Sequence, residues 1–477
     1  MAKEYYPTIG LEIHAELKTQ TKMFCNSKND PEESRPNVNI CAVCLGHPGT
    51  LPTVNKEAVL HVIKVGLAVG GKIADYSEFD RKNYFYPDIP KGYQISQYKY
   101  PLVEGGELSD VALTRVHLEE DTAQSFHKEG EEENFSLVDF NRAGVPLMEL
   151  VTEPVIKSAT QAKYFAQELQ LLLKYLGASD ANMEKGEMRV EANVSISTDP
   201  KILGKKVEVK NLNSFRAVED AINFELARHK VLLEEGKEVI QETRGWNEDK
   251  GETFSQRRKE ESHDYRYFPD PDIPKLTLKE VKEFDLEELR IGLPELPSAK
   301  RDRLERRYGL KREDIELYVQ DTTVGNFFES VSTLLTDAEQ IKLGSNYIAS
   351  DLVGLMNTGN ADTHIKPVDF AQLVMMITRG EVSSRGAKDI LKIMHDTGGT
   401  PKAIAEEHEL FQESNEEALL SVVNKIISEN QTVVADYHAG KTAALQFLVG
   451  QCMKATKGSA NPGILQQIIK KTLSKEV

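Results

Sequence analysis

The hydrophobic pattern changes from a two-residue repeat to a helical repeat near residues 294–297, and this change requires a composite architecture. Before it, residues 187–196 place apolar side chains at every second position, which predicts a half-buried strand with one polar face. After it, Val368–Ile377 and Ala387–Met394 repeat only at helical spacing. The expected fold class is therefore α+β, a mixed-sheet domain followed by helices.

Length and helix signals predict how this fold is divided. The 477 residues exceed the roughly 250–300 at which single cores stop growing. We expect domains at 1–293, 294–405 and 406–477, the last a small helical tail after a break near Glu406–Glu409. Asn213-Ser214 and Ser383-Ser384 can cap helices, the first of which runs to about Gly236.

Composition excludes several classes of protein. Hydrophobic residues at 40% and charged residues at 28% are typical of a water-soluble chain. No stretch approaches the ~18 apolar residues of a membrane span, and the first residues lack an apolar signal region. We therefore expect a cytoplasmic protein without a membrane partner. The net charge of −17 argues against coating a long nucleic acid, although local basic patches can still bind a single one.

One such patch lies at the end of the chain. Residues 438–477 contain six lysines and a single acidic residue, Glu476. This excess suits phosphate binding, and it suits a solvated helical face equally.

Three of the four cysteines are close together in the sequence. Cys41 and Cys44 form a C-x2-C pair, and Cys25 precedes them. Two interpretations stay open, a zinc site without an obvious fourth ligand and three buried thiols in a loop.

Acidic residues and histidine alternate near the N-terminus. On a strand, Glu12, His14 and Glu16 share one face, where they can hold a divalent cation or form an exposed polar surface. A second acidic group, which contains Glu120, occupies residues 117–121 at an expected strand end. Convergence of the two groups would create a site for a hard cation.

Further polar residues indicate contacts with phosphate or nucleotide. Residues 79–88 combine cations, an amide and aromatic rings, which suits a nucleotide site or a loop packed by its own aromatics. Residues 139–149 contain a turn shaped by glycine and proline, and polar strand faces follow it. These segments combine Asn, Arg and Glu, whereas solvated faces usually favour Lys and Glu. The candidate binding residues are Arg81, Lys82, Asn83, Tyr84, Gln94, Ser96, Asn141, Glu149, Arg189, Asn193, Glu208, Lys210 and Asn213.

Two familiar motifs are missing. No Gly-x-Gly-x-x-Gly loop occurs, and residues 435–442 imitate a phosphate loop without its first glycine, so they are interpreted as a helix followed by a loop at Gly440. No amidase-like serine- and glycine-rich loop is visible either. An enzyme that uses glutamine would need ammonia from a partner.

Motifs along almost the whole chain resemble the B subunits of glutamine-dependent aspartyl/glutamyl-tRNA amidotransferases. The matching segments lie in the order of that family. They are residues 10–14 (GLEIH), 80–88, 94–97 (QISQ), 118–121 (LEED), 141–147 (NRAGVPL), 210–214 (KNLNS), 264–269 (DYRYFP), 294–297 (PELP), 447–451 (FLVGQ) and 457–462 (KGSANP).

The resemblance implies a catalytic cradle domain, a helical domain and a tail that touches the tRNA body. It also implies a heterotrimer with an amidase-like glutaminase (the A subunit) and a small third protein (the C subunit). Glu12, His14 and Glu120 match the family's magnesium ligands, and the segment with Lys82, Asn83 and Tyr84 matches the surroundings of the nucleotide and acceptor end. We count Lys82 with these three as catalytic.

The implied reaction uses ATP to phosphorylate the side-chain carboxylate of Asp-tRNA(Asn) or Glu-tRNA(Gln), after which ammonia displaces phosphate. Phosphoryl transfer needs mainly positioning and charge neutralisation. The alternatives are a non-catalytic tRNA-binding scaffold and the E subunit of the archaeal glutamate-specific relative. The latter carries an inserted domain, for which residues 270–294 leave no room.

One position departs from the family pattern. Many members have C-x-C before the C-x2-C pair and bind zinc with four cysteines, whereas this chain has Ser27 at the second position. Three thiolates with water or a carboxylate can still bind zinc, or the loop is metal-free.

Overall fold

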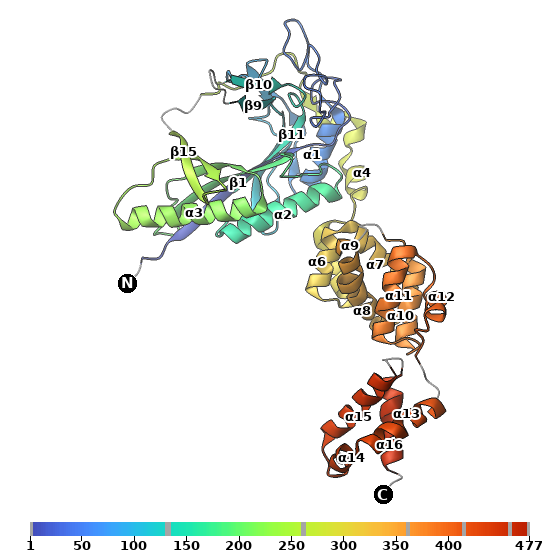
Figure 1. Cartoon of the computed structure of the whole chain (residues 1–477). Helices are drawn as coiled ribbons and strands as arrows, with labels where there is room; N and C mark the ends of the chain where they lie inside the picture. The colour runs from blue at the N-terminus through green and yellow to red at the C-terminus, as the bar shows by residue number, and fades with distance from the viewer. Residues whose placement is uncertain are drawn as a thin grey trace. The chain divides into compact units, whose positions relative to one another are not determined.

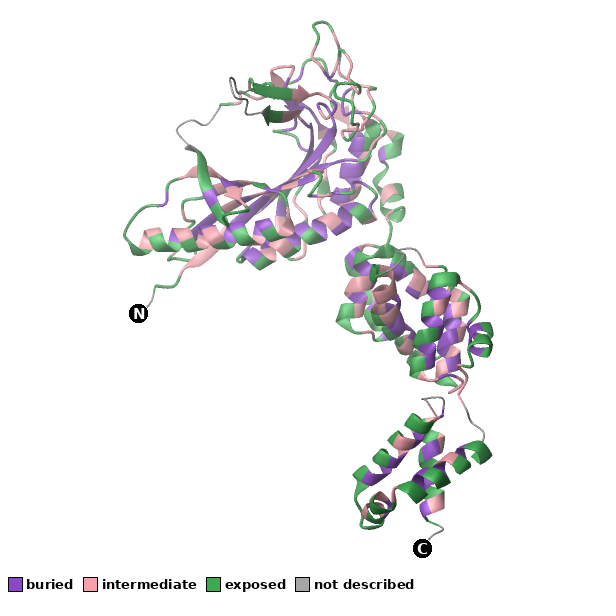
Figure 2. Ribbon diagram, in the orientation of Figure 1, coloured by how far each residue is buried: buried purple, intermediate pink, exposed green. Residues whose placement is uncertain are grey.

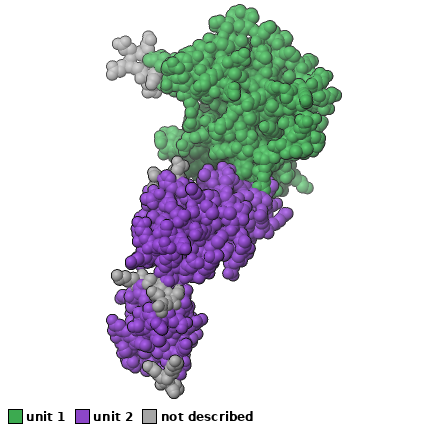
Figure 3. Space-filling view, turned by 90° about the vertical axis from the view of Figure 1, so that its right-hand side faces the viewer, with its two compact units in different colours: residues 1–297 green, residues 298–477 purple. Residues whose placement is uncertain are grey.

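The computed structural model describes residues 3–128, 135–258, 264–358, 363–412, 416–456 and 460–474. The chain divides into two compact units, Met1–Pro297 and Ser298–Val477, coloured separately in Figure 3. Strands concentrate in the first unit and helices make up the second, so the α+β class is confirmed. The finer division into three domains stays a prediction.

A mixed ten-stranded sheet organises the first unit (Figure 1). Its order is β15-β14-β13-β12-β1-β11-β8-β6-β2, with β7 paired to β8; the pairings are antiparallel except β13–β14. The strands are β1 (Tyr6–Glu16), β2 (Lys72–Ile73), β6 (Val103–Glu104), β7 (Glu107–Leu108), β8 (Val111–Glu120), β11 (Pro146–Thr152), β12 (Met188–Ser197), β13 (Val207–Leu212), β14 (Glu242–Asn247) and β15 (Glu252–Arg258).

The central strands have one apolar and one polar face. In β1, Ile9, Leu11, Ile13 and Ala15 are buried, whereas the alternate positions carry the acidic residues and the histidine. Helices α2 (Ala159–Tyr175) and α3 (Phe215–Glu234) run along the sheet, and Figure 2 shows buried residues on the strands and on parts of both helices. The polar face is therefore left for the site.

Smaller sheets complete the first unit. A three-stranded sheet has the order β16-β4-β5, and two-stranded sheets pair β9 with β10 and β3 with β17. The strands and remaining helices are β3 (Tyr76–Ser77), β4 (Asp80–Asn83), β5 (Tyr93–Ser96), β9 (Gln124–Lys128), β10 (Phe135–Asp139), β16 (Phe268–Pro269), β17 (Leu276–Thr277), α1 (Lys56–Ala68) and α4 (Leu286–Ile291).

The second unit is built from helices. They are α5 (Pro297–Tyr308), α6 (Arg312–Gln320), α7 (Thr322–Leu334), α8 (Ala338–Asn346), a π-helical turn (Tyr347–Leu352), α9 (Val353–Thr358), α10 (Pro367–Thr378), α11 (Ser384–Thr397), α12 (Pro401–Glu407), α13 (Glu416–Glu429), α14 (Gln431–His438), α15 (Thr442–Ala455) and α16 (Pro462–Leu473). Helices α13 to α16 share their own apolar core, in which Leu448 and Leu465 are fully buried.

The local predictions hold where the structure describes the chain. The alternation at residues 187–196 is β12, and Ser214 and Ser383 cap α3 and α11 through backbone N–H groups. Residues 435–442 form the end of α14 and a turn at Gly440, as expected. No helix among the described residues combines the length and apolarity needed to span a membrane.

Candidate active site

Strand register gathers the candidate residues on the polar face of the large sheet. His14 of β1 pairs with Glu149 of β11, which in turn pairs with His117 of β8. On its other side, β1 places Glu12 opposite Glu191 of β12. Directly paired residues point to the same face, so four strands contribute side chains to one cluster.

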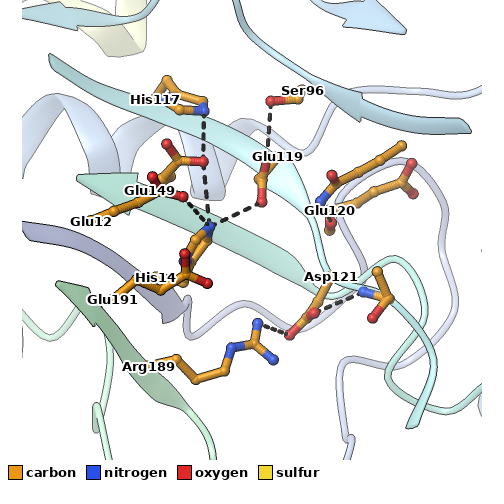
Figure 4. A network of polar contacts seen from close by, with 12 residues as sticks. Glu12, His14, Ser96, His117, Glu119, Glu120, Asp121, Glu149, Arg189 and Glu191 are labelled. Carbon is orange, nitrogen blue, oxygen red and sulfur yellow. Dashed lines mark hydrogen bonds and ion pairs between the residues drawn. The ribbon is translucent and has the colours of Figure 1, made fainter. Parts of the chain in front are cut away.

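His14 is the centre of this cluster, as Figure 4 shows. Its Nε2 atom lies 3.3 Å from Glu149 Oε2, 3.6 Å from Glu119 Oε1 and 3.9 Å from Glu12 Oε1. Two sets of ligand atoms, each within 4.8 Å of one another, share His14: one with Glu12 and Glu191, the other with Glu119 and Glu149. We call these five residues the carboxylate cluster.

Burial and mutual repulsion shift the pKa values of the cluster. Burial, followed by the negative charges of Glu149 and Glu191, raises the pKa of Glu12 to about 7. Burial alone would lower the pKa of His14, but the hydrogen bond and charge of Glu149 outweigh it and raise the value to about 9. Glu12 and His14 therefore hold protons near neutral pH that a bound cation would displace.

Glu149 also has cationic neighbours beyond the cluster. Burial would raise its pKa, but His117 and His14 hold it well below the usual value. His117 Nε2 lies 3.4 Å from Glu149 Oε2, and an Arg115 nitrogen lies 3.5 Å from the other oxygen. Glu149 thus stays ionised and faces His14.

Glu120, expected beside Glu12 and His14, is not brought to them in this structure. It lies on the opposite side of β8, where both carboxylate oxygens are 2.5 Å from Lys91 Nζ and one accepts the Ile95 N–H at 2.9 Å. The structural correction is that Glu119 takes the position facing His14. The sequence contains a signal for this arrangement: His117 and Glu119 are two residues apart on a strand and therefore share one face.

Lys82 borders the cluster, whereas its neighbours in sequence do not. Burial alone would lower the pKa of Lys82, but Glu119, Tyr267 and Glu149 raise it. Its ammonium lies 5.1 Å from the ring centroid of Tyr265. The cation of Lys82 therefore lies beside the carboxylates of the cluster.

Arg81 and Asn83 have structural partners. Arg81 forms ion pairs of 2.7 Å with Asp270 and 2.9 Å with Asp272. The Asn83 amide donates to the carbonyl oxygens of Tyr265 and Arg266. These contacts join β4 to residues 265–272 and do not point to a ligand.

Three more predicted residues lie near Lys82: Gln94 and Ser96 on β5, which pairs with β4, and Tyr84 just after β4. Ser96 Oγ donates to Glu119 at 3.0 Å, and the Gln94 amide donates to the Glu120 carbonyl oxygen at 2.7 Å. Tyr84 contacts Tyr265 edge to face. Gln94 and Ser96 therefore position the end of β8.

The β12–β13 side of the sheet carries a second group of charges. Lys210 lies 2.6 Å from Glu191 and 3.4 Å from Glu208, and Glu208 accepts a hydrogen bond from Thr243. Asn193 Oδ1 is buried and has no hydrogen-bond partner among the described residues.

The structure does not bring the other predicted residues, Arg189, Asn141 and Asn213, to the carboxylate cluster. Arg189 binds Asp121 at 2.7 Å. Asn141 is fully buried and accepts the N–H groups of Val38 and Asn39. Asn213 is exposed just before α3.

The three cysteines meet in a separate loop. Cys25, Cys41 and Cys44 offer sulfurs within 4.8 Å of one another. Ser27 Oγ and the buried Lys22 Nζ each lie 3.9 Å from Cys44 Sγ. A hydrogen bond from Cys25, with Lys22 nearby, lowers the pKa of Cys44 to about 4. This donor set suits zinc.

Sequence reasoning missed several members of the site. The sequence places His117 and Glu119 in the second acidic group without choosing them as ligands, and it does not choose Glu191, Arg115 or Lys91 as site residues. Lys91 and Glu120 line a cavity of about 240 Å³ that also reaches Cys25 and Cys44.

Comparison with known proteins adds independent findings. The family model described as the GatB/GatE catalytic domain matches residues 7–282, and the model described as the GatB domain matches residues 326–473. The B subunit of the aspartyl/glutamyl-tRNA(Asn/Gln) amidotransferase of Thermomicrobium roseum is 43% identical over 99% of this chain and 100% of its own length. Proteins of the same name from Thermoanaerobacter pseudethanolicus (43% identity, 99% and 100% coverage) and Persephonella marina (41%, 98% and 100%) are also similar.

Proposed function

This chain belongs to the GatB/GatE family, and on that premise we propose that it phosphorylates and then amidates the side-chain carboxylate of a misacylated tRNA. The substrates would be Asp-tRNA(Asn), Glu-tRNA(Gln) or both. The observation that carries the proposal is the carboxylate cluster around His14, bordered by Lys82 on one side and Lys210 on the other. Cations around a metal-ligating cluster suit phosphoryl transfer, which depends on positioning and charge neutralisation.

The reaction consists of two balanced steps. A side-chain carboxylate oxygen of the aminoacyl group attacks the γ-phosphorus of ATP, ADP leaves, and an acyl phosphate forms. The nitrogen lone pair of ammonia then attacks the acyl carbon, the bond to the phosphate oxygen breaks, and one proton is lost from nitrogen. No protein nucleophile is required in either step, because ATP supplies the leaving group.

The donor set of the cluster fits Mg²⁺. Carboxylate oxygens are the ligands that this ion prefers, and His14, Glu119 and Glu149 lie close enough to share one ion with Glu12 and Glu191 near them. Bound Mg²⁺ would neutralise charge on the transferred phosphoryl group. The described cysteines likewise fit a structural Zn²⁺, with Ser27 beside them.

The chain's own cations do the remaining work. Lys82, half-buried near Glu119 and a tyrosine ring, is placed to pair with the substrate carboxylate or the γ-phosphate. Lys210, 2.6 Å from Glu191, can turn to phosphate oxygens on the β12–β13 side. The orphaned oxygen of Asn193 adds an acceptor there for a ribose hydroxyl or a base amine.

The relatives are named as subunits, which supports a complex. We expect a glutaminase, the A subunit, to supply ammonia and a small C subunit to complete a heterotrimer in the cytoplasm, where mischarged tRNA is made. The assembled complex should form ADP only when mischarged tRNA is present, and amidated tRNA only when glutamine or ammonia is added. This chain alone should not hydrolyse glutamine.

The competing function is a tRNA-binding scaffold without chemistry. It predicts that variants of the carboxylate cluster retain full ADP formation, because the reaction would then take place elsewhere in the complex. The scaffold would be favoured if the Glu119→Gln and Glu149→Gln variants bind tRNA tightly and still form ADP at the normal rate when tRNA is present.

A further inference from the structure

A row of tyrosine rings leads outward from Lys82. The ring of Tyr265 lies 5.1 Å from the ammonium, Tyr267 contacts Tyr265 edge to face at 6.2 Å, and Tyr98 stacks on Tyr267 at 4.5 Å with an interplanar angle of 14°. We call Tyr98, Tyr267 and Tyr265 the tyrosine row. It begins beside the carboxylate cluster and ends at the surface.

The outer end of the row is a ring with an open face. Tyr98 is 63% exposed although one of its faces is covered by Tyr267. Its backbone N–H donates to the buried carboxylate of Asp80 at 3.0 Å, which fixes the backbone two residues after β5 ends. Tyr98 is therefore held in place by Tyr267 and by its backbone, and it offers an exposed ring on which another flat ring can stack.

The middle ring of the row, Tyr267, is affected by the charges of the site. Burial is the first cause that raises the pKa of Tyr267 to about 12, and the negative charges of Glu119 and Glu149 add to it while Lys82 opposes them. The hydroxyl side of this ring therefore lies within electrostatic reach of the proposed metal ligands. One continuous aromatic path joins the open surface to the cluster.

The three-stranded sheet brings the row together. Strand β4 pairs with β5, which precedes Tyr98, and with β16, which follows Tyr267. Two exposed cations flank the rings in sequence, Lys99 next to Tyr98 and Arg266 next to Tyr267. Aromatic rings interleaved with cations are the pattern by which proteins hold single-stranded nucleic acid.

We propose that the open face of Tyr98 stacks the 3′-terminal base of the tRNA and so directs the aminoacyl group along the tyrosine row to Lys82. This deepens the proposed function, because it assigns a binding position to the substrate of the same site. The unpaired bases of RNA ends are recognised by stacking on aromatic side chains, which does not require a particular sequence. The exposed cations supply phosphate contacts on either side.

Equilibrium binding of uncharged tRNA to the assembled complex without ATP tests this assignment. The tRNA is used intact and without its terminal nucleotide. Base stacking predicts that removing this nucleotide weakens binding to the unmodified complex about tenfold. Tyr98→Ala should weaken binding of intact tRNA by a similar factor and leave binding of shortened tRNA unchanged, whereas Tyr98→Phe should behave like the unmodified protein.

A matched control and a second variant make the test independent of folding. Tyr164→Ala removes a 44% exposed ring on α2, outside the row, and should change neither affinity. The indole introduced by Tyr98→Trp should retain the affinity, and its fluorescence should be quenched by intact tRNA and not by shortened tRNA. The only other tryptophan, Trp246, provides a constant background.

Two results would overturn the inference. Tyr98→Ala could weaken both tRNAs equally, which would make Tyr98 a residue that only packs its loop. It could also weaken neither. Because these measurements contain no ATP, they are separate from the proposed phosphorylation: loss of tRNA-dependent ADP formation refutes the reaction, and loss of the difference between the two tRNAs refutes the stacking.

Discussion

Glu119 and Glu120 are consecutive in sequence and face opposite sides of β8. Glu119 Oε1 lies 3.6 Å from His14 Nε2, whereas the Glu120 carboxylate lies 2.5 Å from Lys91 Nζ. Side chains of a strand alternate between its faces, so only one of the two can join the carboxylate cluster. This relationship separates a proposed metal ligand from a buried ion pair in the adjoining cavity.

Glu119→Gln should abolish most ATP-dependent activation. Loss of a ligand that holds the phosphoryl-neutralising ion is expected to lower tRNA-dependent ADP formation about a hundredfold or more, with tRNA affinity almost unchanged. The measurement is ADP release by the assembled complex at varied magnesium.

Glu120→Gln is the matched variant. It should keep the magnesium dependence and lower the melting temperature, since it leaves Lys91 without its charged partner. The sequence-based assignment of Glu120 as a ligand predicts the reverse, so a Glu120→Gln protein that needs far more magnesium would restore that assignment.

The buried Glu225 should make the first unit sensitive to acid. Burial would raise its pKa, but His229 Nε2, 3.1 Å away, and hydrogen bonds from Arg228 hold it at about 2, against an ordinary value of 4.5. A depressed carboxyl pKa contributes stability that is complete above about pH 4.5 and is lost as the pH falls through about 2. Glu225→Gln should therefore cost on the order of 3 kcal/mol near pH 7.

Thermal unfolding of both proteins between pH 7 and 3 checks this expectation. The difference in melting temperature should be constant down to about pH 4.5 and shrink below it. Glu219→Gln is the control on the same helix, because its pair with Lys163 lies nearer the surface and should contribute little. A difference between the Glu225 variant and the unmodified protein that grows in acid would contradict the assignment.

Metal analysis should find one zinc per chain in the cysteine loop. Cys41→Ser should release it, and Ser27→Cys should slow its removal by a chelator, because a fourth thiolate replaces a hydroxyl beside Cys44. Cys452→Ser alters a buried thiol of α15 and should leave the zinc content unchanged. The opposite result is that the unmodified protein lacks zinc even when metal is supplied, whereas the Ser27→Cys variant binds it. This result would show that zinc binding requires the fourth cysteine that Ser27 replaces.

Lysines of the tail should contribute affinity for tRNA and nothing to the chemistry. Lys470 and Lys471 are exposed in the last turn of α16, and Lys454 is exposed in the last turn of α15. Replacing the first two by alanine should raise the KM for mischarged tRNA and flatten its salt dependence by about 0.9 per lost phosphate contact. The predicted contacts of residues 457–459 and of Lys475 lie outside the described residues.

Two readouts separate this role from a structural one. Hydrolysis of glutamine without tRNA should not change in the double variant. Lys441→Ala removes a lysine already paired with Asp436 at 2.8 Å and should have a smaller effect on the salt slope. An unaltered KM for tRNA in the double variant would identify the tail lysines as a solvated face.

The sequence by itself determined the elements and the faces of their side chains. The alternation of residues 187–196 became β12, and Ser214 began α3, because both signals depend on dihedral angles and hydrogen bonds between near neighbours. The same period placed Glu12 and His14 on one side of β1. The family motifs added the expected ligands, cations and partners.

Only the tertiary structure decided which faces meet. His14 reaches Glu149 and Glu119 because β11 lies between β1 and β8 in a particular register, and a shift of one residue would present Glu120 instead. Tyr98 and Tyr267 stack because β4 pairs with the strands next to both. Such pairings join residues far apart in the chain, and their energy depends on the burial of whole strands, which no local pattern encodes.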